Sequence, residues 1–224
     1  MFKKLFILAF LSIFISIIKL SNSTKCVVPA SANVPVSKKG TIAFQESQIC
    51  PPGCTDCVVR PLYTPQQTNL TKASCGSFDK YKNKPITNGR FVHHRYTEAE
   101  KAMDRYNGQC GLGVYYAMHA AVGSALFSDK SLYNSNKQRW VCSNVKDLPG
   151  GKVAYILNDD VCVNKCVKIE CPTTGKTLTI PIMDETDYLK YNELDVTGEV
   201  QDYFGFKDTS GWVKATITYM DCPQ

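Results

Sequence analysis

Residues 192–206 read NELDVTGEVQDYFGF, and this stretch does most to decide the fold. Thr197 is a suitable N-cap, because a threonine hydroxyl can accept a hydrogen bond from one of the free N–H groups that begin a helix. The spacing of Val200, Tyr203 and Phe204 lets all three side chains share one helical face. The stretch therefore predicts a brief helix that begins shortly after Asp195.

The segment that follows, residues 211–222, alternates between two kinds of side chain. One set is apolar and the other is mixed: Val213, Ala215, Ile217 and Tyr219 against Trp212, Lys214, Thr216 and Thr218. Successive residues of a strand point to opposite faces, so this pattern predicts a half-buried final strand.

Several short strands are predicted upstream. Residues 166–171 and 177–183 read as a hairpin joined by a four-residue turn at 173–176. Residues 90–97 are typical of a strand, whereas the Ala-rich run at 115–127 fits either a helix or a buried strand. Many short strands with one short helix favour a compact β-barrel.

Five motifs occur in order: NGQCG at 107–111, AVGSALF at 121–127, CVKI at 166–169 after Cys162, a strand ending at Asp184, and NELDVT at 192–197. Residues 89–224 thereby resemble the double-psi β-barrel domain of expansins, barwin, kiwellin, rare-lipoprotein-A proteins and family 45 endoglucanases. The resemblance implies a mainly β fold, a six-stranded double-psi β-barrel with short helices. Residues 24–88 would precede it as a small disulfide-bearing extension.

The resemblance also implies a polysaccharide groove across one face of the barrel. Asp195 matches the aspartate of the family motif, as a candidate acid or groove carboxylate, and Asp184 matches the aspartate that ends the preceding strand. Thr186, Tyr188 and Trp212 are further candidates for substrate binding.

Whether such a groove cuts its ligand depends on a second catalytic group. Inverting glycosidases need a base opposite the acid, and in the hydrolytic relatives it is an aspartate of the first strand. Here that strand carries His93 and His94 and no carboxylate. The resemblance therefore favours an expansin-like protein that binds or loosens extracellular polysaccharide without hydrolysis and needs no cofactor.

Two other functions stay open. A kiwellin- or inhibitor-like module would bind a secreted protein, and a lytic enzyme would cleave glycan with Asp195 as its general acid. The carboxylates also have a purely structural interpretation, because an aspartate before a helix or at a strand end can simply bond backbone N–H groups.

The N-terminus predicts secretion. Residues 1–23 carry two lysines at positions 3 and 4 and contain an apolar run at 5–18, which is shorter than the roughly 20 residues of a membrane-spanning helix. We expect a cleaved signal peptide and a secreted, monomeric protein with no membrane association after cleavage. Asn69-Leu70-Thr71 is an N-glycosylation sequon that fits this compartment.

The chain has 11 cysteines, which in an oxidising compartment favour disulfides over metal sites. We expect three disulfides, with pairing left open, among the six barrel cysteines: Cys110, Cys142, Cys162, Cys166, Cys171 and Cys222. The short run Cys50, Cys54 and Cys57 has no matching second pair at zinc-finger spacing, so no metal is predicted.

The formal net charge of +6 does not predict a nucleic-acid partner. Removing the leader removes three lysines and lowers the charge to +3. Residues 24–88 then carry a balance of +5, and residues 89–224 carry −2. A mildly acidic barrel is a poor surface for phosphate groups.

Overall fold

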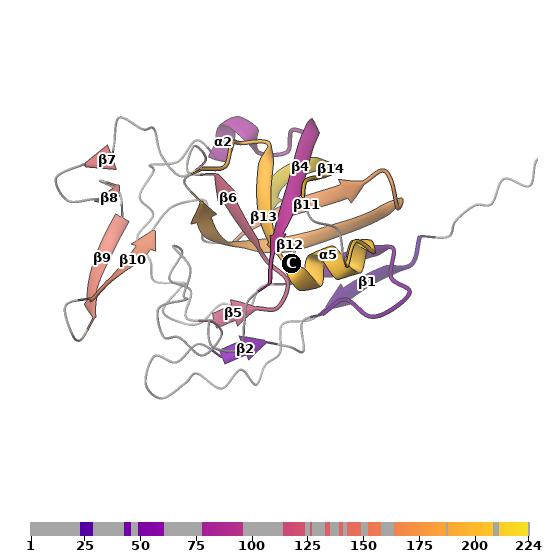
Figure 1. The fold of residues 1–224 in the computed structure, drawn as a ribbon, viewed down its shortest axis with the longest axis horizontal. Coiled ribbons are helices and arrows are strands. Elements are labelled where there is room, and N and C mark those ends of the chain that lie inside the picture. Colours follow the sequence, from indigo (N-terminus) through magenta and orange to yellow (C-terminus); the bar gives the residue numbers. More distant parts are fainter. Residues whose placement is uncertain are drawn as a thin grey trace, which may run out of the picture.

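The computed structural model describes residues 23–28, 43–45, 49–60, 78–95, 114–123, 126, 133–134, 139–140, 143–148, 152–157, 164–186, 188–207 and 211–223 (Figure 1). The signal peptide, Asn69, Cys110, Cys142 and Cys162 lie outside these residues. The predictions that concern them stay predictions.

The predicted six-stranded barrel is confirmed. Its strands are β4 (Ile86–His94), β6 (Ala120–Gly123), β11 (Lys165–Cys171), β12 (Lys176–Thr186), β13 (Glu193–Thr197) and β14 (Val213–Asp221). They hydrogen-bond in the order β12-β11-β14-β4-β13-β6, and β6 pairs with β12 to close the barrel. The pairing is mixed, because β13–β4 and β12–β6 are parallel while the others are antiparallel. This arrangement is consistent with a double-psi barrel.

The N-terminal part adds a disulfide-bearing strand pair to this sheet. β1 (Lys25–Val28) runs parallel to β3 (Asp56–Val59), and β3 runs parallel to the first half of β12. Disulfides Cys26–Cys54 and Cys50–Cys57 hold the pair. The predicted boundary between residues 88 and 89 falls within β4, so the extension and the barrel share one sheet.

The remaining strands of the described residues form three small pairs. They are β2 (Ala43–Gln45) with β5 (Val114–Tyr116), β7 (Tyr133–Asn134) with β8 (Arg139–Trp140), and β9 (Ser143–Leu148) with β10 (Lys152–Leu157). Two short helices, α2 (Phe78–Tyr81) and α5 (Gly198–Phe204), lie at opposite ends of the barrel (Figure 1). In the described part of the chain, no helix is long and apolar enough to cross a membrane.

The local sequence predictions for the last third of the chain are confirmed. The 166–183 hairpin forms as β11 and β12, and the four predicted inward residues of β14 are all buried. Thr197 is the N-cap of α5, although its side chain makes no capping hydrogen bond. The ring of Phe204 packs against that of Phe91, with 5.3 Å between centroids, so α5 closes one end of the core.

One disulfide prediction is wrong. Cys166 pairs with Cys222, but Cys171 is a free, buried thiol. The two cysteines of β11 are five residues apart, and residues at odd spacing on a strand point to opposite faces. Cys171 therefore turns into the core with Val167 and Ile169, away from the side on which Cys166 reaches Cys222.

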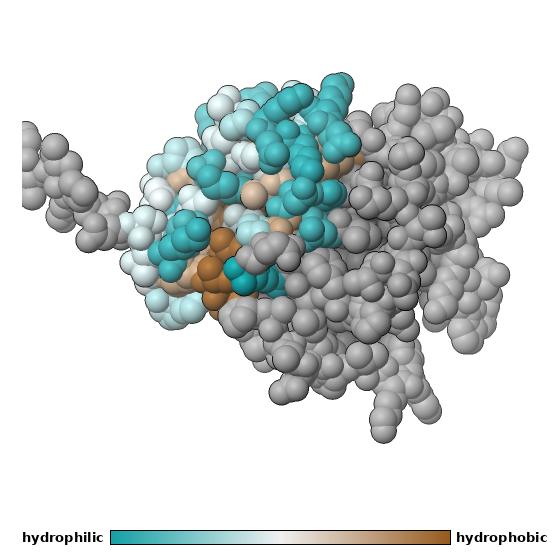
Figure 2. Space-filling view, turned by 180° about the vertical axis from the view of Figure 1, so that it is seen from behind, coloured by the Kyte–Doolittle hydropathy of each residue, from teal (hydrophilic) through white to brown (hydrophobic). Residues whose placement is uncertain are grey.

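Seen from behind, the described part of the surface carries many hydrophilic side chains, and hydrophobic side chains gather in one area of it (Figure 2). The large hydrophobic residues exposed in the described part are Val27, Ile49, Tyr188, Tyr191 and Trp212. Three of these five are aromatic, and two, Tyr188 and Trp212, were predicted to bind substrate.

Candidate functional site

Strand register brings the two predicted aspartates onto one face. Asp184 of β12 pairs with Ala121 of β6, and Ala121 also pairs with Asp195 of β13. Paired residues project to the same side of a sheet, so the two carboxylates flank Ala121. Two strand spacings separate their Cα atoms by about 10 Å. On the far side of β13, Asp195 pairs with Val92 of β4. Asp184, Ala121, Asp195 and Val92 therefore form a row across four neighbouring strands.

The carboxyl group of Asp195 lies in an unusual environment. Its Oδ2 accepts a hydrogen bond of 3.3 Å from the Tyr188 hydroxyl, whereas the buried Oδ1 has no hydrogen-bond partner among the described residues. Burial raises the pKa of Asp195 from its ordinary 3.8 to about 6. The negative charge of Asp184 adds to this rise, while His94 and the Tyr188 hydrogen bond oppose it.

His94 is a site residue that the sequence interpretation missed. It ends β4 opposite Thr197, two residues beyond Val92, and therefore lies on the same face as Asp195. Its side chain is exposed, and its positive charge lowers the pKa of Asp195. The alternation of side chains along the strand could have indicated this residue. His94 is two residues from Val92 and lies on the same face, whereas His93 lies on the opposite face.

Tyr188 is carried by a loop that packs tightly against β6. Gly123 pairs with Thr186, the last residue of β12. A Cβ atom on Gly123 would lie 2.4 Å from the carbonyl oxygen of Leu189, so only glycine lets this loop approach β6 so closely. The backbone N–H of Leu189 donates to the Thr186 carbonyl at 3.2 Å, which completes a turn that presents Tyr188. The Tyr188 side chain is 65% exposed although its hydroxyl reaches Asp195.

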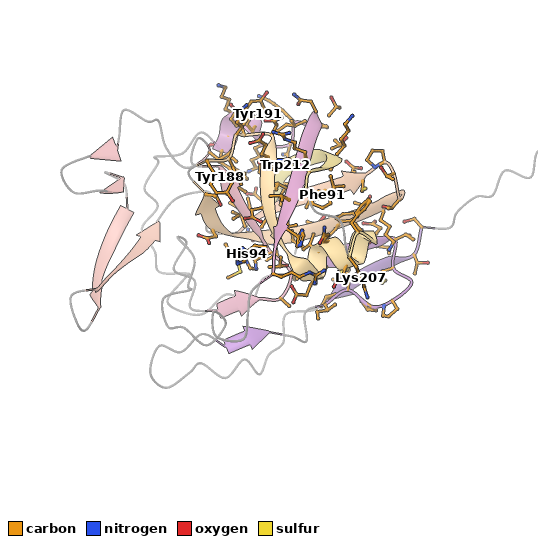
Figure 3. All side chains as sticks on the ribbon, viewed as in Figure 1. Phe91, His94, Tyr188, Tyr191, Lys207 and Trp212 are labelled. Atoms are coloured by element: carbon orange, nitrogen blue, oxygen red, sulfur yellow. A yellow bond between two sulfur atoms is a disulfide. The ribbon has the colours of Figure 1, made fainter. Side chains whose placement is uncertain are left out.

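Trp212 lies at the end of the row opposite Asp184. The register of β14 on β4 pairs Val213 with Phe91, so the preceding residue, Trp212, is beside Val92. Its indole is 40% exposed and covers the guanidinium of Arg90, 4.3 Å from the ring centroid. Figure 3 labels Tyr188, His94 and Trp212 around β13 and β4. Tyr191 is exposed as well, but it stacks on Tyr81 of α2, with 4.9 Å between centroids.

The structure thus brings Asp184, Tyr188 and Asp195 together. Thr186 lies at the adjoining end of β12. Trp212 is farther away, because β4 lies between it and Asp195. Exposed rings beside carboxylates suit a ligand that has both apolar faces and hydroxyl groups. Among the described residues, no three His, Cys, Asp or Glu side chains cluster as metal ligands would.

No family model matches the chain, and no curated protein matches it. Among solved structures, a Streptomyces papain inhibitor is 15% identical, with a TM-score of 0.39 over 62% of this chain and 96% of the inhibitor.

Two further similar structures are expansins of Clavibacter michiganensis. The apo form is 14% identical, with a TM-score of 0.38 over 61% of this chain and 50% of the expansin. A mutant in complex with cellohexaose is 14% identical, with a TM-score of 0.36 over 62% and 52%. The chain thus spans about half of each expansin.

Proposed function

We propose that the protein binds an extracellular polysaccharide, without hydrolysing it, across the face formed by β12, β6, β13 and β4. The observation that carries the proposal is Asp195: a half-buried carboxyl group with a pKa of about 6, beside Asp184 and the exposed ring of Tyr188. Carboxyl groups accept hydrogen bonds from sugar hydroxyls, and aromatic rings pack on the apolar face of a pyranose.

Binding without cleavage fits the geometry of the acid. One oxygen of Asp195 is buried and the other already accepts a hydrogen bond from the Tyr188 hydroxyl, so proton transfer to a ligand would require Tyr188 to move. The residues of β4 on this face are Arg90, Val92 and His94, none of which is a carboxylate. Glu193, the other acid of β13, is buried under Arg90.

An extracellular location is supported by the disulfides. Cys26–Cys54, Cys50–Cys57 and Cys166–Cys222 are typical of proteins that mature in oxidising compartments. The predicted leader at residues 1–23 and the sequon at Asn69 agree with secretion and glycosylation.

Retention on insoluble glycans tests this function. We expect the wild-type protein to be retained on at least one of cellulose, chitin and peptidoglycan. Trp212→Ala should weaken retention by up to about tenfold, since one aromatic contact contributes about 0.5–1.5 kcal/mol. Lys214→Ala is the matched control, because Lys214 is an exposed neighbour on β14. No retention on any of the three glycans would overturn the proposal in favour of the protein-binding alternative.

A second function, glycan cleavage, is favoured by the pKa of Asp195. A carboxylic acid that titrates near 6 is suited to general acid catalysis, and Asp184 could act as the ionised partner across Ala121. The same samples distinguish this function from binding alone. New reducing ends that disappear in Asp195→Asn would establish cleavage, and their absence from wild type would exclude hydrolysis of those glycans.

A further inference from the structure

We propose that Arg90 and Glu193 are positioning residues that hold the ring of Trp212 as a preformed platform for a sugar ring. The inference rests on the proposed function, and it adds Arg90 and Glu193 to Trp212, which the sequence already predicted to bind substrate. It concerns three residues on three neighbouring strands or their ends: Glu193 on β13, Arg90 on β4 and Trp212 before β14.

Glu193 fixes the position of Arg90. Its side chain is only 4% exposed, yet both of its oxygens are bonded. Oε1 accepts hydrogen bonds from Nε and an Nη of Arg90, at 3.1 Å and 2.5 Å, and Oε2 accepts one of 3.0 Å from the backbone N–H of Lys190. The Arg90 hydrogen bond holds the pKa of Glu193 below its usual range, so the pair stays ionised. Two bonds from one planar group leave the guanidinium little freedom to turn.

Arg90 in turn supports Trp212. The guanidinium lies 4.3 Å from the centroid of the indole, the distance of a stacked cation–π contact. One face of the ring is covered, and the side chain remains 40% exposed. Gly211, just before it, has φ +112°, a conformation that other residues rarely adopt, so the chain turns sharply where it presents the ring.

The consequence is a ring whose orientation is set before any ligand arrives. Ordering a free side chain on binding costs about 0.5–1.5 kcal/mol, and a preformed platform avoids most of that cost. The charge of Arg90 is already matched by Glu193, so the role of the guanidinium is to support the ring. Arg90 therefore acts on ligand affinity through Trp212.

A double-mutant cycle tests this role. The chain has two tryptophans, so a Trp140→Phe background leaves Trp212 as the only fluorescent indole. In that background, Arg90→Lys keeps the charge opposite Glu193 but removes the planar group. We expect affinity for cellohexaose or chitohexaose to fall about fivefold, and acrylamide quenching of Trp212 fluorescence in the free protein to rise about twofold. In a Trp212→Ala background, Arg90→Lys should have no further effect on affinity.

The controls separate this inference from the proposed function. Lys214→Ala removes a positive charge from the β14 residue that pairs with Arg90, and it should change neither readout. If Arg90→Lys does not fold, Arg90→Met with Glu193→Gln removes both charges together and is measured in its place.

Unchanged quenching in Arg90→Lys would overturn the inference whether or not the protein binds glycan. Equal loss of affinity with and without Trp212 would also overturn it, because Arg90 would then act independently of the ring. If wild type binds neither oligosaccharide and is retained on none of the three insoluble glycans, the proposed function fails, and altered quenching would show a supported ring that takes no part in glycan binding.

Discussion

Replacing Cys166 and Cys222 together by alanine should lower the free energy of unfolding by about 4 kcal/mol. The disulfide closes a loop with a sequence separation of 56, and the chain-entropy estimate for a loop of that length is about 4 kcal/mol. It ties the start of β11 to the residue after β14, where Lys165 and Lys82 both pair with Asp221. Chemical denaturation of the oxidised protein at constant pH measures the change.

Two controls make this result specific. Cys171→Ala removes a buried thiol that forms no disulfide, and it should cost about 1 kcal/mol or less. The double replacement of Cys50 and Cys57, whose separation is 7, should cost only about 2 kcal/mol on the same entropy scale. If the Cys166 and Cys222 variant lost no more stability than Cys171→Ala, the disulfide would not stabilise this fold.

The second large effect is a pH-dependent stabilisation by Asp195→Asn. The folded-state pKa of Asp195, about 6, lies above its ordinary value of 3.8, so the folded protein holds this proton more tightly than the unfolded chain. The stability that Asp195 contributes is therefore fully present below about pH 4 and is lost as the pH rises through about 6. Asparagine does not ionise, so the variant does not lose this stability as the pH rises. At pH 8 the variant should be more stable than wild type by about 3 kcal/mol, relative to their difference at pH 3.5, because each pKa unit corresponds to about 1.4 kcal/mol.

The neighbours of Asp195 allow the sign to be checked. Asp184 raises its pKa, so Asp184→Asn should move the wild-type transition to lower pH. His94 lowers it, so His94→Gln should move the transition to higher pH. Unfolding free energies measured between pH 3.5 and 8 give all three curves. A difference between wild type and Asp195→Asn that did not change with pH would show that this carboxyl group has an ordinary pKa.

The parts of the fold that sequence predicted well are those in which a pattern is local. Alternation along β14 identifies its buried residues, because period-two burial is a property of one strand. The turn between β11 and β12 brings its two strands together at once. Asp184 and Asp195 were predicted as site residues from the family resemblance. The register of β12 and β13 on β6 places them on one face.

The features that escaped prediction depend on pairings between distant segments. β12 is 11 residues long, and its two halves pair with different parallel strands, β3 and β6. No local pattern records these pairings, so the sequence does not predict that β1 and β3 join the sheet of the barrel. Arg90 and Glu193 are 103 positions apart in the sequence and become neighbours only through the parallel β13–β4 register. The free thiol of Cys171 was missed because spacing alone does not give the face of a strand on which a partner lies.

The proposed function requires a glycan to bind across the row from Asp184 to Trp212. The most direct test is a chemical-shift titration of ¹⁵N-labelled protein with cellohexaose and, separately, chitohexaose. We predict that one of them shifts the Trp212 indole N–H and the backbone amides of Ala121, Tyr188 and Asp195, while β1 and β3 stay unchanged. Binding across this face would be contradicted if both oligosaccharides left the row unshifted, or if the shifts gathered on β1 and β3 instead.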